Sequence, residues 1–191
     1  MKGRESGMPE KETWEGFFNP SGILSIMGVS DEVKDVAEFG CGYGTFTIPA
    51  AKIVKGRVYA VDVEKEMIAL TEQEVKKQHL HNVKAVLRDF LAQGTGLSDE
   101  SVDYVMLFNI LHIEHPDVLL KESYRILRPR GKIGIIHWNY DPLTPRGPSI
   151  DIRPKPEYCI EWAKKAGFVD PKKFDLKLYH YGIVMTKAKS K

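Results

Sequence analysis

The sequence predicts an α/β fold with a mostly parallel β-sheet, on three observations. Apolar runs of strand length alternate with amphipathic runs of helix length along most of the chain. A glycine-rich segment at 38–44, EFGCGYG, separates an apolar run from an amphipathic one, as in a sharp strand-to-helix turn. A second apolar run ends at Asp62, 22 residues beyond Gly40, which is the usual spacing in doubly wound α/β folds.

Each element follows from its local pattern. In chain order we predict a strand at 34–39, a helix at 45–55, a strand at 57–62, a helix at 64–79, strands at 83–88 and 102–108, a helix at 116–128 and a strand at 131–138. The sheet-facing residues of the second helix recur at helical spacing: Met67, Leu70, Thr71 and Val75. Pro116 and Asp117 suit the first turn of the helix that they open. Pro49 lacks a backbone N–H and is tolerated only near the start of its helix.

The last third of the chain has a different pattern. Residues 139–156 contain five prolines, which predict a stiff segment. An amphipathic run follows, with Cys159, Ala163 and Ala166 on one face and Gly167 as its C-cap. Two strands at 172–178 and 180–187 are separated by so few residues that they form an antiparallel hairpin.

The turn at 38–44 has the composition of a ligand-binding turn. Gly40, Gly42 and Gly44 permit positive φ and a close approach of the backbone to a bound molecule. A carboxylate at the place of Asp62 accepts hydrogen bonds from both ribose hydroxyls of a nucleotide. These residues predict a cofactor that contains adenosine. The alternatives are an ordinary turn and a helix N-cap at Asp62.

The spacing argues against two common nucleotide motifs. Dinucleotide binding requires G-x-G-x-x-G/A, but Thr45 and Thr47 stand where the last small residue is needed. The chain has no Gly-Lys-Ser/Thr run, which a phosphate-binding P-loop requires. A nicotinamide-dependent reductase is therefore disfavoured.

The pattern acidic-x-Gly-x-Gly-x-Gly, followed by Asp62 and by Arg88-Asp89-Phe90, resembles the class I S-adenosylmethionine-dependent methyltransferases. Three later segments extend the resemblance over residues 22–187: SVDYVMLFNILHIEHP at 101–116, LRPRGKIGIIHW at 127–138 and AGF at 166–168. Their order and spacing are similar to those of the type 11 branch, which includes the ubiquinone and menaquinone C-methyltransferases.

The resemblance implies a Rossmann-like fold. Its seven-stranded, mostly parallel sheet would have the order 3-2-1-4-5-7-6, with the last strand antiparallel and helices on both faces. A single methyltransferase domain would span residues 21–191. Residues 1–20, which contain Trp14, Phe17 and Phe18, would form a packing arm or a lid.

The resemblance also implies a cofactor site. Its predicted members are Glu38, Gly40, Cys41, Gly42, Tyr43, Gly44, Asp62, Val63, Asp89, Phe90 and Asn109. Glu38 would reach toward the amino group of the methionine part or orient the turn, and Asp62 would hold the ribose. Asp89 would accept from the adenine amino group, unless it is a surface residue only, and Phe90 would donate its backbone N–H to the ring. Asn109 follows a strand at the carboxyl edge of the sheet, near the methyl group to be transferred.

The acceptor would lie beyond that methyl group. His112 and His137 follow strands at the same edge and are candidate bases, because imidazole has a pKa near 6.5, although a lone histidine is more often structural. The proline-rich segment would cover the acceptor, and the candidates for its apolar walls and anion contacts are Trp138, Tyr140, Arg146 and Arg153.

Composition narrows the remaining choices. The chain has 191 residues, which suit one domain, and its net charge of +2 does not favour nucleic acid as a partner. Cys41 and Cys159 form neither a disulfide framework nor a C-x-x-C pair, so we expect a cytoplasmic protein without a metal site. No run has the length of a membrane span.

The sequence therefore predicts an enzyme that binds S-adenosylmethionine. It would transfer the methyl group by in-line displacement to a small-molecule acceptor and leave S-adenosylhomocysteine. The alternative is a catalytically silent S-adenosylmethionine-binding partner subunit, whose glycine turn would be the same.

Overall fold

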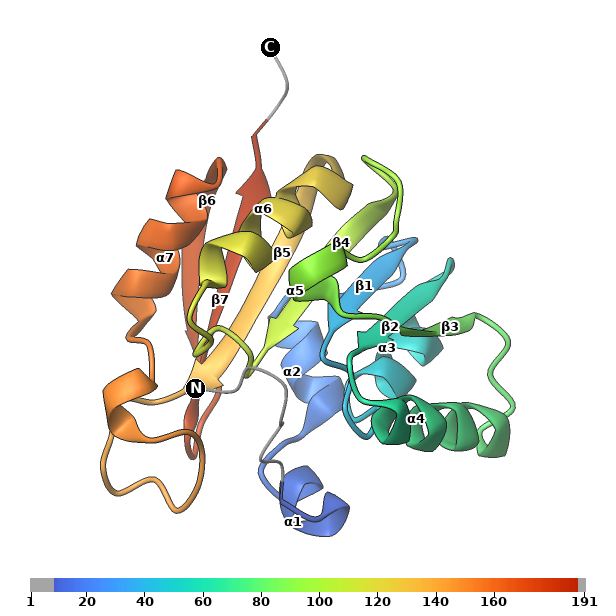
Figure 1. Cartoon of the computed structure of the whole chain (residues 1–191), viewed down its shortest axis with the longest axis horizontal. Coiled ribbons are helices and arrows are strands. Elements are labelled where there is room, and N and C mark those ends of the chain that lie inside the picture. The colour runs from blue at the N-terminus through green and yellow to red at the C-terminus, as the bar shows by residue number, and fades with distance from the viewer. Residues whose placement is uncertain (1–8, 189–191) are drawn as a thin grey trace.

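The structure is a computed structural model that describes residues 9–188, so the first eight residues of the predicted arm lie outside the described residues. Its strands are β1 (Val36–Phe39), β2 (Val58–Asp62), β3 (Val83–Leu87), β4 (Val102–Phe108), β5 (Leu127–Trp138), β6 (Phe168–Asp175) and β7 (His180–Lys187). They form one sheet in the order β3-β2-β1-β4-β5-β7-β6 (Figure 1). The neighbouring strands β3, β2, β1, β4 and β5 run parallel to one another. β7 runs antiparallel to both of its neighbours, β5 and β6. The predicted fold class and strand order are confirmed.

Helices cover both faces of this sheet. They are α1 (Lys11–Glu15), α2 (Pro20–Ile26), α3 (Thr47–Ile53), α4 (Lys65–Lys77), α5 (Phe90–Gln93), α6 (Pro116–Ile126) and α7 (Pro156–Lys165), with a 3-10 turn at Ile150–Ile152. Because α3 begins at Thr47, Pro49 lies in the first helical turn, where its missing N–H breaks no hydrogen bond.

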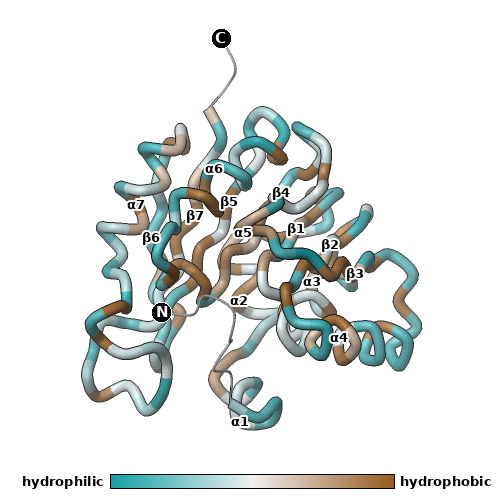
Figure 2. Tube along the Cα trace, in the orientation of Figure 1, coloured by the Kyte–Doolittle hydropathy of each residue, from teal (hydrophilic) through white to brown (hydrophobic). Residues whose placement is uncertain are grey.

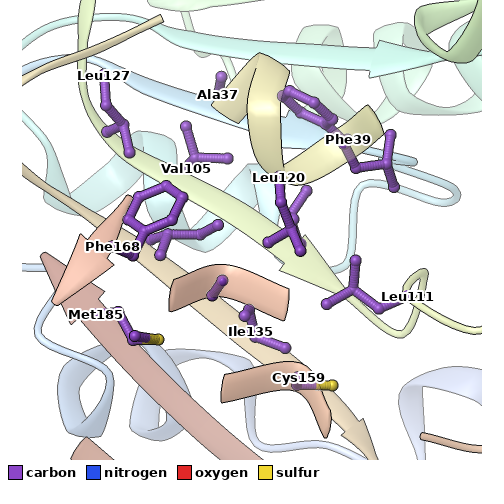
Figure 3. Packing of buried hydrophobic residues seen from close by; sticks show 14 of the residues in the cluster. Ala37, Phe39, Val105, Leu111, Leu120, Leu127, Ile135, Cys159, Phe168 and Met185 are labelled. Atoms are coloured by element: carbon purple, nitrogen blue, oxygen red, sulfur yellow. The ribbon is translucent and has the colours of Figure 1, made fainter. Parts of the chain in front are cut away.

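Alternate residues of the central strands supply the two main cores. On β4, Val105 and Leu107 join the core under α5, α6 and α7, which Figure 3 shows. Tyr104 and Met106 of the same strand join the core under α2 and α3. Apolar colour in Figure 2 accordingly follows the central strands. The period-2 pattern thus buries both faces of the sheet and leaves its carboxyl edge to carry a site.

Two strands begin earlier than predicted. β5 starts at Leu127 instead of 131, and β6 at Phe168 instead of 172. Each includes a proline, Pro129 or Pro171, where the pairing register shifts. A proline normally ends a strand pattern, but a bulge or an edge strand accommodates its missing N–H.

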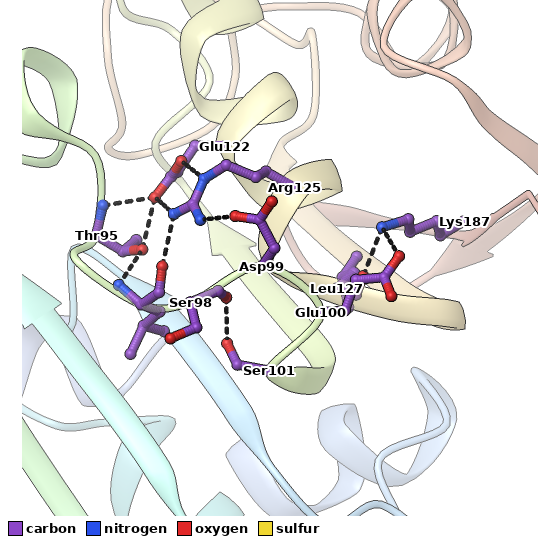
Figure 4. A network of polar contacts seen from close by, with 10 residues as sticks. Thr95, Ser98, Asp99, Glu100, Ser101, Glu122, Arg125, Leu127 and Lys187 are labelled. Carbon is purple, nitrogen blue, oxygen red and sulfur yellow. Dashed lines mark hydrogen bonds and ion pairs between the residues drawn. The ribbon is translucent and has the colours of Figure 1, made fainter. Parts of the chain in front are cut away.

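Charged contacts hold the amino edge of the sheet, opposite the glycine turn. Arg128 donates to Asp103 at 2.8 Å and to Asp35 at 3.0 Å. Nearby, Glu122 accepts from Thr95 and Arg125 (Figure 4). Burial opposes ionisation of Glu122, but these hydrogen bonds outweigh it and lower its pKa to about 2. The polar groups at this edge are therefore used to anchor loops.

Tyr104 provides a test of the packing. Its side chain is 0% exposed, and its hydroxyl donates to the carbonyl of Met27 at 2.9 Å. We expect Tyr104→Phe to lower the free energy of unfolding by about 1–2 kcal/mol, because the carbonyl is left buried without this donor. Urea unfolding measures the change. The exposed Tyr140→Phe is the control, and equal stability of the two variants would contradict the assignment.

Candidate active site

The turn after β1 places three glycines at the carboxyl edge. Gly40, Gly42 and Gly44 have φ of 74°, 53° and 77°, a region that residues with a side chain rarely adopt. A Cβ at Gly40 would lie 3.0 Å from Ile110, and one at Gly44 would lie 3.3 Å from Thr71. Gly42 is itself buried, and its carbonyl accepts from the hydroxyl of Thr71 at 2.9 Å. All three positions thus need glycine for the backbone path of the turn, which lets main-chain atoms come close to a bound ligand.

Asp62 points toward this turn from the end of β2. Its Oδ2 accepts from the N–H of Gly42 at 2.9 Å, and its Oδ1 accepts from the N–H of Glu64 at 3.0 Å. The residue is 6% exposed, and burial raises its pKa while the backbone donors oppose the rise. Each carboxylate oxygen has a further lone pair. Asp62 can therefore hold the turn, lead into α4 and still accept from two ligand hydroxyls.

Glu38 is a second buried acid beside the turn. It is 3% exposed and accepts a hydrogen bond from the hydroxyl of Thr47 on α3. Burial raises the pKa of Glu38 to about 8; the Thr47 hydrogen bond opposes this rise and the charge of Asp62 adds to it. None of the ion pairs between described residues includes Glu38 or Asp62. Two buried acids with no cationic partner in residues 9–188 suit a ligand that carries positive charge.

Unpaired polar atoms lie at the same edge. Asn109, which follows β4 with φ of 56°, has both side-chain amide atoms buried without a hydrogen-bond partner among the described residues. The hydroxyl of Thr45 is likewise buried and unpaired in this part of the chain. A buried polar group without a hydrogen-bond partner lowers the stability of the fold by about 1–3 kcal/mol. A ligand that pairs with these atoms would recover this free energy.

His112 and His137 are in contact, which their sequence positions did not show. His112 Nδ1 lies 3.2 Å from His137 Nε2, and the rings meet edge to face at 73°. His137 is 0% exposed and His112 is half-buried. Burial lowers the pKa of both, His137 the more strongly. Both rings are therefore neutral at pH 7, and His112 can accept a proton while His137 orients it.

Asp89 and Phe90 stand at the start of α5. Asp89 is the N-cap and accepts from the N–H of Ala92 at 3.1 Å. The Phe90 ring packs against Phe39 with ring centroids 5.6 Å apart. A first helical residue has no partner for its N–H within the helix. The local geometry thus gives Asp89 a capping role and is compatible with an N–H donor at Phe90.

The other predicted residues flank the turn. Cys41 is buried, with its sulfur 3.7 Å from the hydroxyl of Thr71, and burial raises the pKa of its thiol. The hydroxyl of Tyr43 donates to the carbonyl of Pro9 at 3.1 Å. Val63 is half-buried and packs against the core under α5 to α7. Tyr43 therefore connects the turn to the N-terminal segment.

Residues 9–18 dock against the site. Lys11 Nζ lies 3.4 Å from Glu74 of α4. Phe17 and Phe18 pack on an aromatic group from the turn, β5 and β7, whose members are Phe46, Trp138, Tyr179 and His180. The three aromatic residues of the predicted arm were the sequence signal for this docking. The helix α1 that carries Trp14 had no clear signal.

Arg153 corrects one expectation about the proline-rich segment. Its side chain is 7% exposed and donates to backbone carbonyls of the segment itself, those of Asn139, Asp141, Arg146 and Pro148. The predicted anion contact at Arg153 is therefore wrong, because its donors are used to fold the segment. Trp138 is also buried, beneath Phe17, whereas Tyr140 is exposed.

Within 9–188, no group of three or more His, Cys, Asp or Glu side chains could hold a metal ion. No helix of this part of the chain is long and apolar enough to cross a membrane.

Comparison with known proteins identifies relatives of this arrangement. Residues 36–131 match the family described as a methyltransferase domain. A demethylmenaquinone methyltransferase of Geobacillus sp. (strain WCH70) is 34% identical over 103 residues, which are 52% of this chain and 43% of that protein. A ribosomal protein L11 methyltransferase of Caldanaerobacter subterraneus subsp. tengcongensis is 30% identical over 153 residues, 75% of this chain and 48% of that protein. The matches thus span less than half the length of these two relatives.

The fold has solved counterparts. A structure described as a SAM-dependent methyltransferase from Aquifex aeolicus superposes with a TM-score of 0.83, at 24% identity and with 94% of each chain covered. At that identity the likeness supports the fold. The family match adds that the segment from β1 into β5, which contains the glycine turn and Asp62, has the sequence of a methyltransferase domain.

Proposed function

Since this chain belongs to the class I S-adenosylmethionine-dependent methyltransferases, we propose that it binds S-adenosylmethionine at the turn after β1 and methylates an acceptor beside β4 and β5. One observation carries the proposal. The buried acids Glu38 and Asp62 lie beside the glycine turn and have no ion pair among the described residues. A nucleoside joined to a cationic amino acid supplies both the hydroxyls and the positive charge that this arrangement accepts.

We assign the cofactor contacts as follows. Asp62 accepts from the ribose hydroxyls, and the backbone around Gly42 lies along the methionine part. Glu38 faces the positive charge of that part, and Asp89 and Phe90 receive the adenine. Cys41, Tyr43, Gly40, Gly44 and Val63 shape the space around these contacts.

The bound cofactor supplies an electrophilic methyl group for in-line displacement. His112 takes the proton that the acceptor loses, while His137 orients its ring through the 3.2 Å contact. Asn109 offers its unpaired amide to a bound polar group near the reacting atoms. Residues 9–18 act as a lid that excludes water from a positively charged centre.

We propose a small molecule as the acceptor and the cytoplasm as the compartment. The proline-rich segment and the aromatic residues of the arm give this side of the site an apolar cover. Both cysteines are free and buried, in keeping with a reducing compartment. The named relatives act on different acceptors, so the acceptor has to be found by experiment.

Calorimetry with S-adenosylmethionine, followed by methyl transfer to a metabolite panel, tests the proposal. Binding with turnover supports an enzyme, and binding without turnover on any compound favours the silent partner subunit. Absence of binding, or thermal stabilisation by NADH instead, would contradict the proposal.

Gly42 gives a matched pair of variants. We expect Gly42→Ala to weaken S-adenosylmethionine binding by about tenfold or more, because a side chain at φ of 53° strains the turn and shifts the backbone along which we place the methionine part. Gly28→Ala is the control, since Gly28 also has positive φ, 78°, and its added Cβ would meet only Lys132, at 3.9 Å. Both variants should lose about 1 kcal/mol of stability. Equal affinities of the two, measured by calorimetry, would place the ligand elsewhere.

A further inference from the structure

We infer that Glu38 exchanges its proton for the positive charge of the bound methyl donor, which makes cofactor affinity pH-dependent through this one side chain. The inference rests on the proposed function and adds to it a specificity role for Glu38. It begins from the absence of an ion-pair partner for this side chain in the part of the chain that the structure describes.

Among residues 9–188, no cationic side chain forms an ion pair with Glu38. Its strand neighbours, Ala60 on β2 and Met106 on β4, are uncharged, and α3 contributes the hydroxyl of Thr47. The charge of Asp62 acts on Glu38, and both carboxyls in turn act on the thiol of Cys41. Burial raises the pKa of all three. The free protein therefore holds Glu38 largely protonated at pH 7.

The ligand brings the missing charge. S-adenosylmethionine carries a sulfonium and an ammonium against one carboxylate, so its net charge is positive. A cation next to a buried carboxyl favours the ionised form. On binding, the O–H bond of Glu38 breaks, the electron pair stays on the carboxylate, and the proton leaves to solvent. The neutral side chain becomes the counter-ion of the ligand.

Linkage fixes the direction of the effect. When binding releases a proton, affinity rises with pH wherever the free protein still holds that proton. The pKa of Glu38, raised to about 8, sets the upper limit of this range. The slope approaches about tenfold per pH unit for one proton. Because the amino group of the ligand titrates at about 7.7–8.0, the range from pH 6 to 7 reports on the protein.

Titration calorimetry in two buffers with different heats of ionisation measures affinity and released protons together. For S-adenosylmethionine we expect up to tenfold tighter binding at pH 7 than at pH 6 and release approaching one proton. S-adenosylhomocysteine lacks the sulfonium charge and should release less. 5′-Methylthioadenosine lacks the amino acid and is neutral, so its affinity should change less than twofold and release no proton.

Variants assign the proton to Glu38. Glu38→Gln imitates the protonated side chain and should remove both the pH dependence and the proton release. Glu157→Gln removes an exposed acid that pairs with Lys173 and should keep the wild-type slope. Thr47→Val removes a hydrogen bond that lowers the pKa of Glu38 and should shift the pH range upward.

The outcomes separate the inference from the proposed function. A wild-type affinity for S-adenosylmethionine that does not change with pH, without proton release, would overturn the inference, as would a wild-type slope in Glu38→Gln. If Glu38→Gln binds S-adenosylmethionine too weakly to measure, Thr47→Val provides the test. An upward shift of its pH range supports the inference, and an unchanged pH range overturns it. Failure of all three ligands to bind would refute the proposed function itself.

Discussion

We expect Asp62→Ala to weaken S-adenosylmethionine binding by a factor of about 10² to 10⁴. Two hydrogen bonds from ribose hydroxyls to a carboxylate are each worth about 1.5–3 kcal/mol, and about 1.4 kcal/mol corresponds to tenfold in affinity. The substitution also removes the acceptor for the N–H of Gly42, which helps to fix the turn. Calorimetry on wild type and variant measures the loss.

Asp103→Ala is the matched control. Asp103 likewise accepts from a backbone N–H, that of Asp35 at 2.9 Å, and it also pairs with Arg128. It lies at the amino edge of the sheet, away from the glycine turn. We expect this variant to lose stability and to keep its cofactor affinity within about twofold. Similar losses of affinity in both variants would mean that Asp62 acts only through the stability of the fold.

We expect His112→Gln to lower turnover by a factor of about 10² to 10⁴, the usual contribution of a general base, with little change in cofactor affinity. Burial holds the pKa of His112 below its ordinary value of 6.5. The protonated form therefore accumulates only in acid, so wild-type turnover should fall as pH drops through that pKa. In His112→Gln, turnover should not show this fall at low pH. Rates on a compound that the wild type methylates provide the measurement.

His115→Gln is the control for this variant. His115 is exposed at the N-cap of α6 and should keep wild-type turnover and pH dependence. An unchanged rate in His112→Gln would show that the contact between His112 and His137 serves packing. The acceptor would then lose its proton without help from an imidazole.

Local signals were sufficient for much of the fold and for the cofactor half of the site. Strand and helix periods differ clearly in this chain, so the parallel part of the sheet was predicted within a few residues. The glycines of the turn and Asp62 follow from backbone geometry, and the structure brings them together through the bond between Gly42 and Asp62. The strand order came from the family resemblance.

Other features depend on tertiary contacts that no local pattern encodes. The contact of His112 with His137 requires a loop after β4 to meet β5. Arginine is a residue type that often binds anions, but the guanidinium N–H groups of Arg153 all donate to groups of the proline-rich segment itself. The short helix α1 is held by the contacts of Lys11 with Glu74 and of Trp14 with Phe18, and α5 by the Asp89 cap. Pro129 and Pro171 remain inside strands because the register shifts around them.

A crystal structure of the protein with S-adenosylhomocysteine tests most directly whether the glycine turn and Asp62 hold the cofactor. We predict both ribose hydroxyl oxygens at hydrogen-bond distance from Asp62, about 2.5–3.0 Å, and the amino acid part beside Gly42. A nucleoside bound elsewhere on the chain, with Asp62 contacting only Gly42 and Glu64, would contradict the account.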